Sequence, residues 1–256
     1  MRSLVAFVRK EFTEQHRSGR MWITLALFIL LGIMNPAIAK LTPWLLELMA
    51  DSMADAGMTV TLTEVSAMDS WVQFYKNLPI GLIAFVLLEG SVFTKEYSSG
   101  TLVLSLTKGL KRYKVVLSKV GVLAAIWSLS YWTCFGITYL YNAYFWDNSV
   151  AKSLAFSVLC WWIFGMLTIA LMTLFSTLST SNTGVLLGVG AVVLAFWALG
   201  MLPKVNKYLP TKLLDGNSLI YGAKEPKDYV AAIIITATLA LACFAASLPI
   251  FNRKQL

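Results

Sequence analysis

Few residues in this chain of 256 amino acids have the types and spacing that catalysis or metal binding needs. His16 is the only histidine, so paired haem ligands are excluded. The three cysteines lie far apart inside apolar stretches and read as small buried apolar residues. The motifs GxxxxGK[ST], HExxH and GxSxG are all absent. We therefore predict no catalytic residue, no metal and no cofactor in this chain, and no phosphate loop for ATP.

Glu89 is the one acid well inside an apolar run, because Leu78 to Leu88 before it carries no charge. A carboxylate in lipid is costly unless it faces a cavity, a cation or another helix, so we place Glu89 in the interior of a helical bundle. Two roles stay open. One is structural, with Glu89 paired to Arg112, Lys119 or a residue of another span; the other is binding of a substrate or a proton.

The stretch from Glu89 to Lys119 carries a dense cluster of charge. After Glu89 it holds six Lys and Arg residues and a single acid, Glu96, and it lies between two apolar runs. Such a segment belongs in water at an anionic membrane face. Gly100 tolerates positive φ and can break a helix, and Leu102 to Leu106 then offers an apolar patch. The pattern predicts a helix that leaves the bilayer, turns sharply and presents a short amphipathic helix to a partner.

Composition makes the chain an integral membrane protein. It is 58% hydrophobic and 13% charged, with a mean hydropathy of +0.70. The net charge is +8, but the bases cluster beside apolar runs, and no module of basic and aromatic residues is present. We therefore expect membrane lipid, and no nucleic acid, as a partner.

Hydropathy predicts an all-α fold with one transmembrane domain, residues 1–256, and six spans. The spans cover residues 21–39, 71–94, 115–139, 154–178, 184–202 and 229–250, and a loop covers 95–114. Residues 1–20 have the spacing of an amphipathic interface helix, with an apolar face made of Leu4, Val5, Val8 and Phe12. A signal peptide is the alternative, but Glu11 and Glu14 and the lack of a cleavage site disfavour it.

The segment between spans one and two, residues 40–76, is acidic. Asn35-Pro36 allows a kink in span one or an early exit from it, and Thr42-Pro43 predicts the start of a helix. Thr61 and Glu64 have capping-box spacing for a further helix that leads into span two. Whether these helices form a packing lid or a substrate vestibule stays open.

Positive charges orient the chain. With six spans and both termini inside, 13 of the 21 Lys and Arg residues fall on the inner side and 8 on the outer side. Five of those eight lie in a polar segment with several Pro and Gly residues, 203–228. In span five, Gly184 and Gly188 form a GxxxG pattern, which permits close helix packing either within the chain or between two copies.

A set of residues in and after the charged stretch resembles the type-2 permease family of ATP-binding-cassette (ABC) transporters. The residues are Glu96, Gly100, Thr101 and Leu102, followed by Arg112 and Lys119. The resemblance extends to Gln73–Leu78 and Leu106–Leu110, and hydropathy agrees over nearly the whole chain. Many members of that family have a proline where Gly109 stands and a small polar residue where Lys111 stands.

The resemblance implies a permease subunit of an ATP-driven exporter. In that family the loop forms a cytoplasmic coupling helix that docks into a separate ATPase, which binds ATP and Mg. It implies two ATPase subunits, a second permease copy or a homologous permease, and a bacterial plasma membrane with both termini cytoplasmic. The ATPase-coupling residues are then Gly100, Thr101 and Leu102, which shape the loop, Glu96 beside them, and Arg112 and Lys119, which anchor the loop at the headgroups.

The cargo is less constrained than the family. Spans rich in Trp, Phe, Met and Ala suit an amphipathic or hydrophobic molecule such as a peptide, an antibiotic or a lipid. The alternative functions are a secondary transporter or channel that works without an ATPase, and a membrane enzyme or assembly scaffold. Co-purification with an ATPase distinguishes these classes.

Overall fold

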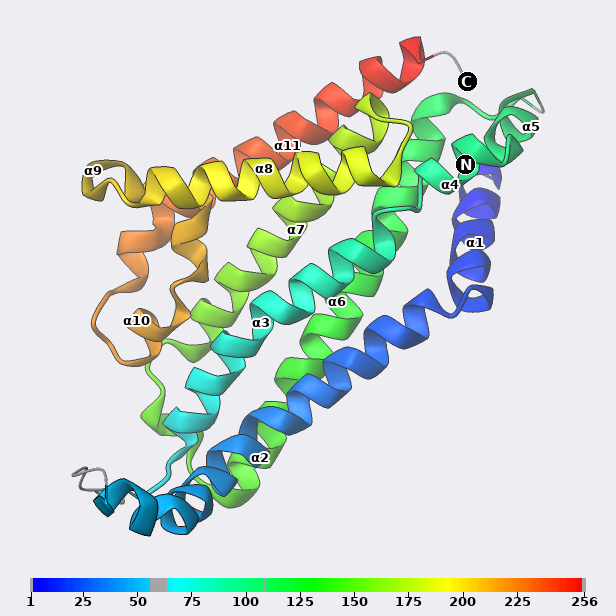
Figure 1. Cartoon of the computed structure of the whole chain (residues 1–256). Helices are drawn as coiled ribbons and strands as arrows, with labels where there is room; N and C mark the ends of the chain where they lie inside the picture. Colours follow the sequence, from blue (N-terminus) through cyan, green and yellow to red (C-terminus); the bar gives the residue numbers. More distant parts are fainter. Residues whose placement is uncertain (1, 56–63, 108, 255–256) are drawn as a thin grey trace.

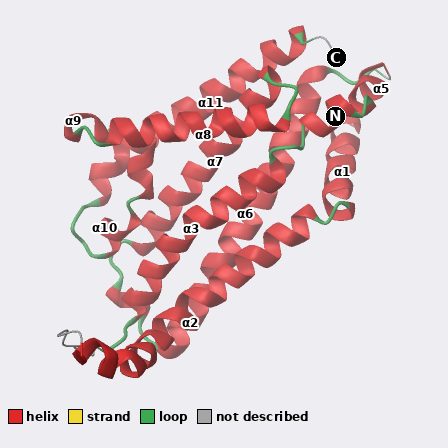
Figure 2. Ribbon diagram, in the orientation of Figure 1, coloured by secondary structure: helices red, strands yellow, loops and turns green. Residues whose placement is uncertain are grey.

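The computed structural model of the protein describes residues 2–55, 64–107 and 109–254. Within these ranges the chain is helical and contains no strand (Figure 2). The helices form an elongated bundle, and both ends of the chain lie at the same end of it (Figure 1). We call this the termini end and the opposite end the distal end.

Six of the described helical segments are long and apolar enough to cross a membrane, which confirms the six predicted spans and the all-α fold. They are Arg20–Leu45, Ala67–Ser98, Arg112–Phe145, Leu154–Leu178, Asn182–Gly200 and Pro226–Arg253. The fourth is the most enclosed, with 67% of its apolar window buried, and the fifth the least, with 11%. The fifth helix therefore presents almost its whole circumference to lipid or to another chain.

The helices of the first half of the chain are α1 (Arg2–Arg17), α2 (Arg20–Asp55), α3 (Ala67–Glu89), α4 (Thr94–Ser98), α5 (Thr101–Thr107) and α6 (Arg112–Phe145). A turn at Gly19, whose φ is 75°, separates α1 from α2. Helix α1 packs along α6, and α2 packs along both α3 and α6. The N-terminal helix is therefore part of the bundle.

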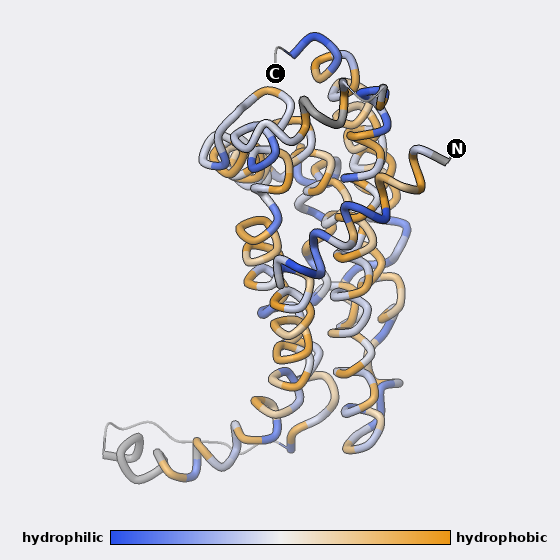
Figure 3. Tube along the Cα trace, turned by 90° about the vertical axis from the view of Figure 1, so that its right-hand side faces the viewer, coloured by the Kyte–Doolittle hydropathy of each residue, from blue (hydrophilic) through white to orange (hydrophobic). Residues whose placement is uncertain are grey.

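Helix α2 runs unbroken past Pro36 and Pro43. Of the two alternatives at Asn35-Pro36, the early exit is therefore wrong and a kink stays compatible with the continuous helix, and the predicted helix start at Thr42-Pro43 is wrong. Tertiary hydrogen bonds explain the difference, because the buried Asn35 amide donates to Thr138 Oγ1 at 3.0 Å and accepts from Asn77 Nδ2 at 2.8 Å. These bonds hold α2 against α6 and α3, and only its distal part bends away from the bundle (Figures 1 and 3).

Helix α3 is capped by Ser66, and the predicted capping role of Glu64 is wrong; Thr61 lies outside the described residues. Ser66 Oγ accepts a hydrogen bond from Met68 N at 3.2 Å, and the Asp69 carboxylate accepts one from Ser66 N at 2.9 Å. This is the same capping-box chemistry, a few residues further along the chain.

The helices of the second half are η1 (Asn148–Val150), α7 (Leu154–Leu178), α8 (Asn182–Gly200), α9 (Pro203–Asn206), η2 (Pro210–Leu214), α10 (Gly216–Ile220), η3 (Pro226–Tyr229) and α11 (Val230–Arg253). Of the short helices between α8 and α11, η2 and α10 pack back against α7, and α10 also packs against α3. Trp161 Nε1 donates to Leu214 O at 3.0 Å, and an added Cβ at Gly216 would lie 2.3 Å from the Tyr75 ring. Residues 203–228, which we call the wedge, thus pack against α3, α7, α8 and α11.

Aromatic rings fill the centre of the bundle. Trp127 of α6 is fully buried, and its ring lies 5.8 Å from Phe28 of α2 and 5.3 Å from Phe85 of α3. Gly165 of α7 makes room for it, because a Cβ there would lie 2.1 Å from the indole. This packing fixes the relative positions of α2, α3, α6 and α7.

Candidate functional site

Residues 90–111, which we call the elbow, join α3 to α6 at the termini end and contain α4 and α5 (Figure 1). Gly100 separates the two short helices with a φ of 67°, and Gly109 has a φ of 86°. A Cβ added at either glycine would meet no atom within 4 Å, so the left-handed backbone is what requires glycine there. The positive φ predicted at Gly100 is confirmed. A proline, frequent in the family at the position of Gly109, cannot adopt this φ, so the elbow has its own turn geometry there.

Apolar contacts fasten the elbow to three other helices. Leu102 of α5 and Phe93 are buried in one cluster with Phe7 of α1, Val116 of α6 and Phe251 of α11. The predicted exposed patch at Leu102 to Leu106 is therefore wrong for Leu102, which faces the protein; the side chains of 103–105 lie outside the described part. Displacing α5 displaces the side chain that ties these helices together.

The hydroxyl-bearing residues of the elbow make further contacts. Tyr97 OH donates to Ser176 O at the end of α7 at 3.1 Å. Thr101, at the start of α5, lies with its hydroxyl 2.8 Å from the Ser99 hydroxyl, on the exposed side of the elbow. The elbow thus has one face bound to the bundle and one face open to a partner.

A buried ion network lies directly beside the elbow. Lys119 Nζ of α6 lies 2.8 Å from Glu11 Oε2 of α1 and 3.0 Å from Glu96 Oε2 of α4, and it also donates to Val92 O at 3.1 Å. Lys119 is 1% exposed, Glu11 3% and Glu96 4%. These three side chains therefore join α1, the elbow and α6 through charges that are almost fully buried. Breaking such a pair leaves an uncompensated buried charge.

Lys10 closes the network on its exposed side. Its ammonium contacts Glu96, lies 2.8 Å from Glu14 Oε2 and lies 3.1 Å from Glu11 Oε1. Burial opposes the charged form, but the hydrogen bonds to Glu14 and Glu96 outweigh it and raise the pKa of Lys10 above its ordinary value. Burial likewise acts to raise the pKa of Glu14, but the bond from Lys10 outweighs it and lowers that pKa. Two lysines and three carboxylates together carry one net negative charge.

The three carboxylates of the network do not suit a metal ion. Glu11, Glu14 and Glu96 each bring an oxygen within 4.8 Å of the others, a spacing that a cation would need. The ammonium groups of Lys10 and Lys119 bind these same carboxylates. Each of the three carboxylates is therefore already paired with a lysine, and we assign the group as an ion network.

Glu89, at the end of α3, is 1% exposed, which confirms its predicted place in the bundle interior. Its Oε2 accepts a hydrogen bond from Gln15 Nε2 of α1 at 2.5 Å. The predicted pairing with Arg112, Lys119 or a residue of another span is wrong, because both cations bind other groups and Gln15 lies on α1, which is not a span. Glu89 therefore ties α3 to the same helix that the ion network holds.

The predicted anchoring of Lys119 at the headgroups is wrong, because Lys119 is buried, whereas the predicted headgroup position of Arg112 stays a prediction. Arg112 Nη1 donates to Phe251 O at 2.8 Å, Asn252 O at 3.1 Å and Lys254 O at 2.6 Å. These are carbonyls at the C-terminal end of α11, where unpaired helix carbonyls favour a cation. Arg112 thus joins the end of the elbow to the last helix, and Lys119 is enclosed in the ion network.

The partners of Lys119 and Glu96 on α1 were missed at the level of sequence. Phe7, Glu11 and Gln15 recur at a spacing of four residues and form the face of α1 that packs on the bundle. Val5, on the predicted apolar face, is 66% exposed, and Val8 and Phe12 are exposed as well. The available signal was the pair of acids in an otherwise basic helix, with Lys10 and Glu14 at i, i+4.

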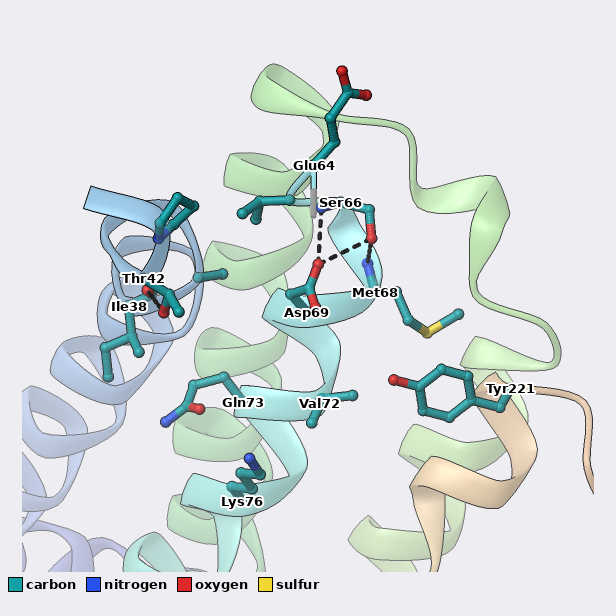
Figure 4. A pocket seen from close by; sticks show the side chains of 13 residues that line it. Ile38, Thr42, Glu64, Ser66, Met68, Asp69, Val72, Gln73, Lys76 and Tyr221 are labelled. Carbon is teal, nitrogen blue, oxygen red and sulfur yellow. Dashed lines mark hydrogen bonds between the residues drawn. The ribbon is translucent and has the colours of Figure 1, made fainter. Parts of the chain in front are cut away.

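A second candidate region lies at the distal end. An open cleft of about 520 Å³ lies between α2 and α3, with Tyr221 on its rim (Figure 4). Glu64, Asp69, Gln73 and Lys76 line it, but the Asp69 carboxylate is already held by Ser66. The cleft lies where the sequence allowed either a lid or a vestibule, and its lining mixes apolar and charged groups.

The comparisons with known proteins agree with this architecture. A family model described as ABC-2 family transporter protein matches residues 5–256. No curated protein matches the chain. The chain therefore belongs to the ABC-2 transporter family, as the resemblance indicated. Members are membrane permease subunits that are in general not catalytic themselves and associate with ABC ATPase subunits, and with six apolar helices this chain is a multi-pass membrane protein.

Proposed function

We propose that this chain is the permease subunit of an ATP-driven exporter and is coupled through the elbow to separate cytoplasmic ATPase subunits. The feature that supports this most is the attachment of the elbow to the bundle. Leu102 binds it into the apolar cluster with α1, α6 and α11, and Glu96 binds it to Lys119 and Lys10. A force applied to the exposed side of the elbow therefore acts on three helices at once.

The proposed assembly has two permease chains, identical or homologous, and two ATPase subunits that bind ATP and Mg. Six spans supply half of the membrane unit of this family. The termini end faces the cytoplasm of a bacterial plasma membrane, which places the elbow and the N-terminal bases inside. When the ATPases close around ATP they displace the elbow, and the helices tied to it tilt between inward-open and outward-open arrangements.

The proposed cargo is an amphipathic or hydrophobic molecule such as a peptide, an antibiotic or a lipid. The distal cleft supports an amphipathic cargo, because Ile38, Val72 and Met68 line it together with Glu64 and Lys76. Such a lining can accept an apolar body and a polar end group. Helix α8 packs on α7 with one side and has only 11% of its apolar window buried, so its open side provides surface for the second permease chain.

The test uses the full chain with its co-purified ATPase, reconstituted in proteoliposomes. Glu96→Ala and Gly100→Pro are expected to abolish export and to uncouple ATP hydrolysis from it. Gly121→Ala is the matched control, since Gly121 lies inside α6 and an added Cβ meets nothing within 4 Å. Normal coupling in both elbow variants contradicts the proposal. Transport by liposomes that lack any ATPase identifies a secondary transporter or channel instead.

A further inference from the structure

A second buried lysine lies far from the elbow, in the wedge between α8 and α11. Lys212 of η2 is 8% exposed. Among the described residues, the nearest carboxylate oxygen is Asp215 Oδ2, at 4.0 Å from Lys212 Nζ, which is too long for a hydrogen bond. Its other close neighbour is an aromatic face, the ring of Tyr229, whose centroid lies 4.8 Å from Nζ. The ammonium thus has one long ion pair and one aromatic face, and an anion placed beside it would add a direct charged hydrogen bond.

Asp215 is not available to neutralise Lys212, because other donors occupy its carboxylate. Lys224 Nζ lies 2.7 Å from Oδ2, Tyr229 OH donates to the same oxygen at 3.3 Å, and Ser218 N donates to Oδ1 at 3.3 Å. Burial and the neighbouring Lys224 lower the pKa of Lys212 to about 8. Asp215 is therefore bound more closely by Lys224 than by Lys212.

Lys212 faces a cavity. A space of about 320 Å³ is lined by Trp197, Gly200, Met201, Asn206, Thr211, Lys212 and Asp215. Thr211 Oγ1 is buried and has no hydrogen-bond partner within the described part of the chain. A Cβ on Gly200 would lie 3.7 Å from Thr211 Oγ1 and 4.0 Å from Asn206 Oδ1, so both polar groups border the cavity beside a residue that has no side chain. The volume is at the lower end of small-ligand pockets.

The position of the cavity relative to the membrane restricts the ligand. Helix α8 has 19 residues, a length of about 28 Å at 1.5 Å per residue, which matches a hydrocarbon core of about 30 Å. If α8 crosses the hydrocarbon core over this length, its C-terminal residue, Gly200, reaches the lipid headgroups on the side opposite the termini. Trp197 and Tyr208 are exposed around it, as aromatic residues at a membrane interface are.

We propose that this cavity binds a phosphate group at the distal headgroup level, with Lys212 as the charge partner and Thr211 as a hydrogen-bond donor. The phosphate belongs either to an acidic phospholipid of the bilayer or to free phosphate in the surrounding water. In both cases the anion supplies the acceptors that the ammonium and the hydroxyl lack. The site does not depend on the proposed coupling to an ATPase.

The test measures binding to the full chain in neutral detergent. Native mass spectrometry follows a titration with phosphatidylglycerol, and thermal unfolding follows a titration with sodium phosphate against sodium chloride at equal ionic strength. We expect Lys212→Met to weaken phosphatidylglycerol binding about tenfold and Thr211→Val about threefold, from the loss of one charged and one neutral hydrogen bond. Thr211→Val keeps the lysine and serves if Lys212→Met fails to fold.

Lys204→Met is the matched control, because Lys204 lies in the same segment but is exposed. It is expected to bind phosphatidylglycerol within twofold of the wild type. Stabilisation by phosphate alone that requires Lys212 assigns the site to free phosphate, whereas a requirement for phosphatidylglycerol assigns it to lipid. Binding that Lys212→Met and Thr211→Val both leave unchanged overturns the proposal, as does an equal loss in Lys204→Met.

Discussion

Lys119 and Lys212 are both buried lysines, yet their surroundings are opposite. Lys119 is within 3.0 Å of two carboxylates and donates to a backbone carbonyl, and these partners come from α1, α4 and the turn between α3 and α4. Lys212 has its nearest carboxylate oxygen at 4.0 Å and lies beside a cavity. A buried lysine therefore has a different role at each of these two positions.

The contrast shows that the surroundings of a buried charge determine its role. Removing an ammonium from water costs several kcal/mol, and the cost is recovered only by close partners of opposite charge. At Lys119 those partners are part of the protein, so the charge fixes the relative positions of helices. At Lys212 the nearest carboxylate oxygen among the described residues is 4.0 Å away, so the ammonium is suited to an anionic ligand from outside the chain. Mutation of Lys119 is therefore expected to lower the free energy of unfolding, and mutation of Lys212 is expected to weaken ligand binding.

The largest effect is expected at Lys119. Lys119→Met removes the cation between Glu11 and Glu96 and leaves two buried acids with only the half-exposed Lys10, so we expect a loss of about 3–5 kcal/mol of unfolding free energy. Denaturant unfolding of the purified chain in detergent measures it.

Glu89→Gln is the control for this prediction. Glu89 is equally buried at the same end of the bundle, but its partner is the neutral amide of Gln15. A neutral side chain of the same shape keeps an acceptor for that amide, and we expect a change within about 1 kcal/mol. Equal losses in Lys119→Met and Glu89→Gln would show that the ion network contributes no more than packing.

A smaller effect is expected at Arg112. Arg112→Gln removes the guanidinium that binds three carbonyls at the end of α11, a loss of about 1.5–3 kcal/mol for hydrogen bonds from a charged donor. The loss is expected to fray the C-terminal end of α11, and hydrogen exchange of the backbone amides of residues 247–253 measures this fraying. Lys111→Met, a neighbouring exposed charge, is expected to leave this exchange unchanged. Normal protection in Arg112→Gln would contradict the assignment of Arg112 as a cap.

The backbone of the elbow provides the next prediction. Gly100→Ala forces a side chain into a φ of 67° and is expected to cost about 1–2 kcal/mol, although the added Cβ meets no neighbour. Gly121→Ala, with equal free space but in a regular helix, is expected to stabilise the chain by up to about 1 kcal/mol. Thermal unfolding of the two variants side by side measures the difference. The same sign for both would mean that the left-handed turn stores no strain.

Sequence predicted those features that depend on a short stretch of chain. Six apolar runs gave six helices, Gly100 has the positive φ that its residue type permits, and Glu89 is enclosed because an acid in an apolar run has to be. The partners of these residues depend on distant segments. Glu11 and Lys119 are 108 positions apart, and Lys10 and Glu96 are 86 apart, and no local pattern specifies such pairs.

The early exit that the sequence allows at Asn35-Pro36 is a case in which tertiary contacts override a local rule. Pro36 has no backbone N–H to donate, which disfavours a continuous helix, and the prediction of an exit relied on this cost. The buried bonds of Asn35 to Asn77 and Thr138 outweigh it, because an amide that is enclosed and fully bonded keeps its helix in place. Lys212 was passed over for the same reason, since only the fold shows that one of five lysines in its segment is buried.

The smallest effect is a pH dependence that belongs to Lys212. Its pKa is lowered to about 8 in the folded chain, from an ordinary value of about 10.5, so between these two values the unfolded chain binds more protons than the folded one. Stability therefore rises with pH through this window, by less than about 1 kcal/mol between pH 7 and 8.5. The Lys224 ammonium lowers the pKa of Lys212 while its own pKa is raised, so the two lysines titrate as a pair, and the Lys212→Met variant is what isolates the contribution of Lys212.

Thermal unfolding of the wild type and Lys212→Met at both pH values measures this difference, and Lys204→Met serves as the exposed control. The rise is expected in the wild type and in Lys204→Met and is expected to vanish in Lys212→Met, where no buried amine is left to titrate. Bound phosphatidylglycerol is expected to flatten it as well, because an anion beside Nζ favours the charged form. Parallel pH profiles for all three proteins would mean that Lys212 is compensated within the chain, and the contrast with Lys119 would then disappear.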